Sequence, residues 1–276
     1  MRRVAAFAAL AVLLGGCGSG GPAPITIGAA REYRLAELAP AALRPDRPQR
    51  ISFVVDQPSG AALTRYRTGP GPHTGVHLIF VRSDLGTIIH LHPKPAADGR
   101  VSADVTFPTP GRYRMIVDVY PASGPTPNFQ LPRRLTVAGT PVSKPLPPFR
   151  RSVTVDGYTF ALRRRPNLHA IQASFLTFTV RDPAGRPARF TPWFGALAHA
   201  IFFRAGTLDY FHTHVCGSGT TGCTSFVGGP RVVGTSTKPG VLRVGVLVPV
   251  AGTWRLFLQT KVNGHVLTAP FTLDVR

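Results

Sequence analysis

Two copies of one pattern occur along the chain, and this duplication limits its possible folds more than any other feature. Residues 53–60 (FVVDQPSG) are matched by residues 178–185 (FTVRDPAG), and residues 108–114 (PTPGRYR) by residues 249–255 (PVAGTWR). Each copy is about 110–120 residues long, which is too long for one repeat of a solenoid and is typical of a duplicated domain. We therefore predict two tandem domains, 31–138 and 153–276, joined by a proline-rich linker at 139–152.

Short segments rich in β-branched and aromatic residues alternate with turn residues in each copy. In the first copy, strands are predicted at 50–55, 76–81, 87–92, 101–107, 113–119 and 134–137. This spacing predicts an all-β fold of two tandem antiparallel β-sandwich domains of immunoglobulin or cupredoxin type, with a small barrel as the alternative. Tyr113 and Trp254 lie inside strands and are predicted to be core residues.

Six of the nine histidines fall in a spacing, His-x12-His-x-His, that occurs once in each copy. The residues are His77, His90 and His92 in the first copy and His199, His212 and His214 in the second. If 76–81 and 87–92 form a hairpin, His77 lies opposite His92, and His90 projects from the same face. Opposed side chains have Cβ atoms ~5 Å apart and diagonal ones ~7 Å apart, so three imidazoles can reach one ion. The second copy gives the same register.

Three imidazoles on one face predict a site for Cu(II) or Zn(II), because nitrogen ligands suit these ions better than they suit Mg²⁺ or Ca²⁺. The alternative is structural. Apolar residues such as Ile79 and Ile201 share the histidine face, so the imidazoles could form a hydrogen-bonded rim of the core. The remaining histidines have no counterpart in the other copy and are expected in exposed loops: His73, His169 and His265.

The beginning of the chain has the features of an export signal. Two arginines precede a short apolar run at 4–14, which is too short to span a membrane and is typical of a signal peptide. The run ends in LGGC at 14–17, which resembles the lipobox of bacterial lipoproteins. The resemblance implies a signal peptide at 1–17, a lipid anchor on Cys17, a flexible tether at 18–30 and an extracytoplasmic, membrane-anchored protein. An ordinary secretory signal is the alternative.

The second copy also carries two cysteines, Cys216 and Cys223, in a segment rich in Gly, Ser and Thr. In an oxidising compartment two such cysteines most simply form a disulfide. A pair of thiolate metal ligands is the alternative, since Cys216 follows His214 by two residues.

Charge limits the partners and the chemistry. The chain has 32 Lys and Arg against 12 Asp and Glu, a formal net charge of +20. An exported protein does not meet chromosomal DNA, so we expect no nucleic-acid partner. Arginines spread over both copies suit anionic envelope polymers, a lipid surface or an envelope protein. With few carboxylates and no nucleophile motif, no enzyme activity is predicted.

The export signal, the β-sandwich repeats, the His-x-His strand and the element at 107–114 (FPTPGRYR) together resemble extracytoplasmic copper-handling proteins with cupredoxin-like or immunoglobulin-like domains. The methionine ligands of those proteins are absent here. The resemblance implies capture, buffering or delivery of copper or zinc at the cell surface, with the six histidines as ligands. The alternative function is a non-catalytic interaction module that binds envelope proteins or anionic cell-wall polymers.

Overall fold

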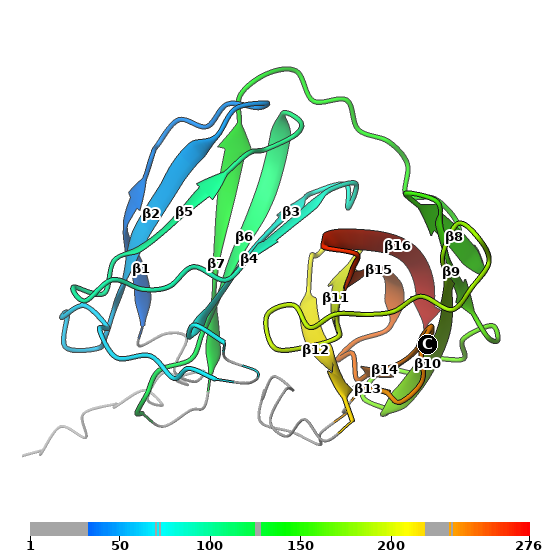
Figure 1. Ribbon diagram of the computed structural model, residues 1–276. Helices are drawn as coiled ribbons and strands as arrows, with labels where there is room; N and C mark the ends of the chain where they lie inside the picture. Colours follow the sequence, from blue (N-terminus) through cyan, green and yellow to red (C-terminus); the bar gives the residue numbers. More distant parts are fainter. Residues whose placement is uncertain (1–32, 70, 72, 125–127, 219–231, 233) are drawn as a thin grey trace, which may run out of the picture.

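The computed structural model describes residues 33–69, 71, 73–124, 128–218, 232 and 234–276. Every regular element in these residues is a β-strand (Figure 1). The predicted all-β class is therefore confirmed. Within these residues no helix is long and apolar enough to cross a membrane. The leader with Cys17 and the cysteine Cys223 lie outside the described residues.

Strands of the first domain (residues 34–137) form two sheets that pack face to face (Figure 1). The smaller sheet has the order β1 (Arg34–Ala39), β2 (Gln49–Asp56), β5 (Val101–Val105). The larger has the order β4 (Ile88–Leu91), β3 (Val76–Arg82), β6 (Gly111–Val119), β7 (Phe129–Val137). Between them lies a core that includes the fully buried rings of Phe53, Phe80 and Phe107.

The second domain (residues 152–275) is a single nine-stranded sheet. Its order is β16 (His265–Val275), β15 (Gly252–Val262), β11 (Ala198–Arg204), β12 (Tyr210–Gly217), β13 (Gly234–Ser236), β14 (Val241–Val246), β10 (Ser174–Arg181), β9 (Tyr158–Leu162), β8 (Ser152–Val155). Strand β13 runs parallel to β12, which differs from the antiparallel arrangement predicted for the whole domain. The two edge strands, β8 and β16, contact each other, so the sheet curls around one core. This domain therefore resembles the barrel alternative more closely than the first domain does.

The duplicated Pro-x-x-Gly segment anchors an aromatic ring in each domain. As predicted, Tyr113 and Trp254 are buried in the two cores. The Tyr113 hydroxyl donates to the carbonyl of Thr109 at 2.9 Å, and Trp254 Nε1 donates to the carbonyl of Val250 at 3.0 Å. Each ring therefore ties the start of its strand to the preceding turn by an equivalent hydrogen bond.

The larger sheet of the first domain packs against the β11–β12–β15 part of the second. Successive residues of a strand point to opposite faces, and both faces are covered here, because every residue of β3 is buried. One face of β3 enters the core of its own domain. The other joins an apolar cluster that both domains build from Ile79, Val81, Leu85, Ile116, Ile201, Phe203 and Phe257.

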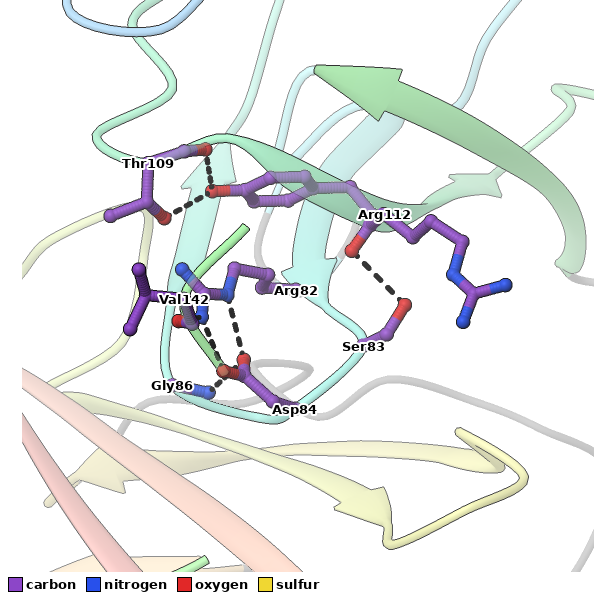
Figure 2. Close-up of polar contacts among 8 residues, drawn as sticks. Arg82, Ser83, Asp84, Gly86, Thr109, Arg112 and Val142 are labelled. Carbon is purple, nitrogen blue, oxygen red and sulfur yellow. Dashed lines mark hydrogen bonds and ion pairs between the residues drawn. The ribbon is translucent and has the colours of Figure 1, made fainter. Parts of the chain in front are cut away.

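The linker is fixed to both domains. Figure 2 shows the guanidinium of Arg82 bonded to the carboxylate of Asp84 and to the carbonyl oxygen of Val142 in the linker. Further along, Leu146 packs against the interdomain cluster, and the Thr272 hydroxyl donates to the carbonyl of Pro147 at 2.6 Å. The two domains are therefore held together by the linker as well as by their apolar faces.

Candidate functional site

Both histidine hairpins have the predicted register. Ile79 pairs with His90 and Leu78 with Leu91 in the first hairpin, while His199 pairs with His214 and Ile201 with His212 in the second. The stacked rings of His77 and His92, with centroids 4.2 Å apart, complete the first set. Each hairpin therefore presents its three imidazoles on one face.

Those two faces point at each other across the domain interface. The ring centroids of His90 and His199 are 5.0 Å apart, and those of His77 and His212 are 5.3 Å apart. None of the six side chains is more than 8% exposed. The two predicted triads are thus one buried group, the six-histidine cluster, which consists of His77, His90, His92, His199, His212 and His214.

Ligand nitrogens in this cluster form three triads, each with its nitrogens within 4.8 Å of one another. The triads are His77, His90, His92; His77, His212, His214; and His90, His199, His212. Two of them combine residues from both domains. Any two triads share one histidine, so the cluster offers one ion several overlapping ligand sets and does not offer two separate three-histidine sites.

Nitrogen separations in the cluster fit an ion of the size of zinc or copper. Two nitrogens bound to one tetrahedral metal at about 2.0–2.1 Å lie roughly 3.3 Å apart. His199 Nδ1 and His212 Nε2 are 3.4 Å apart, and the Nε2 atoms of His90 and His92 are 2.9 Å apart. The Nδ1 atoms of His92 and His212 are buried without a hydrogen-bond partner among the described residues. Buried polar atoms of this kind are normally satisfied, so hydrogen bonds among the described residues do not satisfy all the imidazoles of the cluster.

Partners outside the cluster orient three of the rings. His77 Nε2 donates to the carbonyl of Gly71 at 3.0 Å. His90 Nδ1 donates to Gln259 Oε1 at 3.0 Å, which leaves the Nε2 lone pair directed into the cluster. His199 Nε2 donates to the carbonyl of Trp193 at 2.9 Å, which leaves its Nδ1 lone pair facing His212. Metal-binding histidines in proteins are usually held in this way by a hydrogen bond from the second ring nitrogen.

A buried carboxyl group adjoins His77. Asp118 Oδ2 lies 3.5 Å from His77 Nδ1, and the carboxyl group accepts hydrogen bonds from Tyr120 at 3.1 Å and Asn128 at 3.0 Å. No lysine or arginine among the described residues forms an ion pair with Asp118, which is 1% exposed. A buried negative charge is costly without a positive partner, and a divalent ion bound next to His77 would supply one.

Burial keeps four of the imidazoles neutral. Loss of solvation, reinforced by the repulsion of neighbouring imidazoles, lowers the pKa of His90, His199 and His212 well below the usual value. The same two causes lower the pKa of His92. A neutral imidazole has the free lone pair that metal binding requires, so these four residues are ready to bind an ion at neutral pH.

Aromatic residues of the second domain cover the cluster from outside. The ring of Phe194 stacks on His92 with centroids 3.9 Å apart, and Trp193 meets His90 edge-on at 5.5 Å. Phe194 has a φ of 48°, which is unusual for a bulky residue and shows that surrounding contacts determine its position. His73 is half-buried against both His92 and Phe194, so the expectation that it lies in an exposed loop is wrong. It has no counterpart in the second copy, and the duplicated spacing could not reveal it.

Cys216 lies near the end of the second histidine strand, β12. It is buried in β12 and disulfide-bonded, which removes the thiolate that a metal-ligand role would need. Its predicted partner, Cys223, lies outside the described residues, so that pairing stays a prediction.

Asp118 and Gln259 were not among the predicted site residues, although the duplication contains a signal for both. Each lies seven positions after the glycine of the repeated Pro-x-x-Gly segment, at Gly111 and Gly252. They occupy equivalent places in the sheets, because Asp118 pairs with His77 and Gln259 pairs with His199. Extending the alignment of the copies by a few residues would have placed both beside the histidines.

Solved structures that are similar to this chain have low sequence identity to it and low TM-scores. A tetra-tandem repeat from the extending region of a large adhesion protein is 12% identical, with 88% of this chain and 49% of that chain covered and a TM-score of 0.27. Invasin, a bacterial integrin-binding protein, is 15% identical, with 88% and 39% covered and a TM-score of 0.23. Fibronectin(III)-like modules of Clostridium thermocellum CbhA are 11% identical, with 85% and 88% covered and a TM-score of 0.21. This chain thus spans about half or less of the first two, and these scores support no functional inference.

The comparison with curated proteins found no match. A family model does match, over residues 30–126 and 153–276, which together make up most of the chain. The two matched segments contain the two histidine hairpins. The chain therefore belongs to the family described as Domain of unknown function (DUF8832).

Proposed function

We propose that the protein binds one Cu(II) or Zn(II) ion in the six-histidine cluster between its domains, for metal capture, buffering or delivery outside the cytoplasm. The observation that carries the proposal is the convergence of both duplicated triads on one buried place. Burial alone does not explain six adjacent imidazoles, because ordinary apolar residues would fill the same space without unpaired nitrogens.

A binding role is proposed, and not a catalytic one, because the cluster is closed. Every imidazole is at most 8% exposed among the described residues, which leaves a substrate little access to a bound ion. The lipid anchor on Cys17 would place this ion carrier at the membrane surface. A second candidate function is the interaction module, which draws on the exposed arginines of the second domain.

Calorimetric titration of the purified, metal-free chain with Cu(II) and with Zn(II) tests the proposal. We expect one tightly bound ion per chain. The double variant His77→Gln/His212→Gln removes a ligand from all three triads, and we expect it to weaken binding at least about tenfold for each lost ligand. His265→Gln is the matched control, because His265 is exposed and belongs to no triad.

Equal affinity in the double variant and the control would overturn the proposal, provided that thermal unfolding shows both variants to be folded. Two independent ions of similar affinity would also contradict it, because the triads overlap. If the double variant does not fold, single variants at His77 and at His212, each removing two triads, give the same comparison.

A further inference from the structure

The second domain contains a cavity, and none of the six histidines lines it. It is a cavity of about 340 Å³ between the end of β9 and the start of β10. Its lining includes Arg164, Arg165, Asn167, Ser174, Phe175 and Thr177. This volume lies at the lower end of the range in which proteins bind small molecules.

The lining is positive and has no acidic residue. Arg164 and Arg165 are exposed, and neither guanidinium has an ion pair or a hydrogen bond within the described part of the chain. Arg243 adds a third cation at the rim, because its guanidinium carbon lies 3.2 Å from the ring centroid of Phe175. The hydroxyls of Ser174 and Thr177 and the amide of Asn167 supply neutral hydrogen-bond donors.

Aromatic stacking holds two of these guanidinium groups while their N–H edges stay free. Arg243 stacks on Phe175, and Arg165 lies over the ring of Phe149 at 5.0 Å. Phe175 is itself 36% exposed, which is unusual for a large apolar side chain on a sheet. A stacked guanidinium loses less freedom when it forms bidentate hydrogen bonds, so the arrangement favours an anion with several oxygens.

The segment that carries the arginines is fixed at several points. The side chain of Arg151 donates to the carbonyls of Leu162 at 3.0 Å and Arg163 at 2.5 Å. The Arg163 amide donates to the carbonyl of Thr177 at 2.9 Å. The cations therefore project from a defined backbone and not from a free loop.

We propose that this cavity binds a phosphate group carried by a larger molecule. Phosphate offers several oxygens to two or three guanidinium forks, and its charge matches a lining without carboxylates. A neighbouring cavity of about 220 Å³ shares Arg165 and Asn167 and adds Arg276, but its lining also contains the carboxylate of Asp274, which would repel an anion. The phosphate could belong to a soluble polymer or to a lipid headgroup, and this inference does not depend on metal binding.

Binding of the full chain to two probes tests the proposal: inorganic polyphosphate in solution, and phosphatidylglycerol vesicles with phosphatidylcholine vesicles as blank. The site variant is Arg164→Gln/Arg165→Gln. The control, Arg65→Gln/Arg67→Gln, removes the same charge from exposed arginines of the first domain. We expect the site variant to lose at least about tenfold in affinity while the control changes less than about twofold.

Loss confined to the site variant with polyphosphate supports the proposal and indicates a soluble polymer as the source. The same loss with vesicles supports it and indicates a lipid headgroup. Equal losses in both variants would show only the general attraction of a basic protein for anions and would overturn the site. If the chain binds neither polyphosphate nor the phosphatidylglycerol vesicles, the proposal is overturned too. Metal titrations of the same variants should be unchanged, so this proposal and the metal proposal can fail separately.

Discussion

The two halves of the histidine cluster have the same backbone plan but differ at one equivalent position. Asp118 lies beside the first histidine strand and Gln259 beside the second, at matching places in the duplicated sheets. Asp118 brings a buried carboxyl group near His77 of its own domain, whereas Gln259 accepts a hydrogen bond from His90 of the other domain. One half thus carries the carboxyl group, and the other orients a ring of its partner.

Acid should affect both halves at once and should have the largest effect. Folding lowers the pKa of His90 and His92 in one half and of His199 and His212 in the other. Below a pH of about 6.5 the unfolded chain therefore binds more protons than the folded chain does. The contribution of these histidines to the free energy of unfolding is complete above that pH and is lost as the pH falls. Between pH 6.5 and 5.0 the loss is at most about 2 kcal/mol for each histidine.

Guanidinium unfolding of the metal-free chain at pH 7.5, 6.5 and 5.0 measures this loss. We expect little change between the first two values and a loss of several kcal/mol at the third. His92→Gln should flatten the slope by about one proton. A stability that is independent of pH over this range would mean that the imidazoles are not held neutral.

Removing a buried apolar side chain should destabilise the protein equally in the two halves. Ile79 and Ile201 follow the first histidine of each copy by two residues, and both are fully buried in the interdomain cluster. We expect Ile79→Ala and Ile201→Ala each to lower the free energy of unfolding by about 2–5 kcal/mol. Chemical denaturation of the two variants gives the comparison, with Ile171→Ala, at a position 81% exposed, as the control. A large effect of only one variant would show that one hairpin alone carries the interface.

The charge difference should have the smallest effect on stability and the clearest effect on binding. Asp118→Asn keeps the shape but removes the charge, so Zn(II) affinity should fall about 10–100-fold. Gln259→Leu removes two neutral hydrogen bonds, with His90 and with Thr268, of which only the first reaches the cluster, so we expect a loss of about fivefold. The exchange Asp118→Asn/Gln259→Glu moves the carboxyl group to the other half and should recover most of the affinity. Competition titration with a chelator of known affinity measures all three, and a larger loss at Gln259 than at Asp118 would reverse the assignment.

The sequence predicted the hairpin register because side-chain alternation and turn length leave few choices for a strand pair. It did not predict that both histidine faces meet, because one copy alone does not show what covers the outer face of its sheet. A partial signal was present: residues 76–82 (VHLIFVR) have a nearly continuous apolar run, which is typical of a strand buried on both sides. The curled sheet of the second domain was also beyond prediction, since closure depends on contacts between β8 and β16, far apart in the chain.

The docked linker has a consequence for how an ion would be bound. Because Arg82 holds the linker on one side and Thr272 holds it on the other, the two halves of the cluster meet before any ion arrives. Ordering two separate domains around a metal would otherwise weaken binding, whereas here the effective concentration of one half at the other is fixed by covalent connection. The six-histidine cluster is thus preorganised, and the proposed ion would find its ligands already assembled.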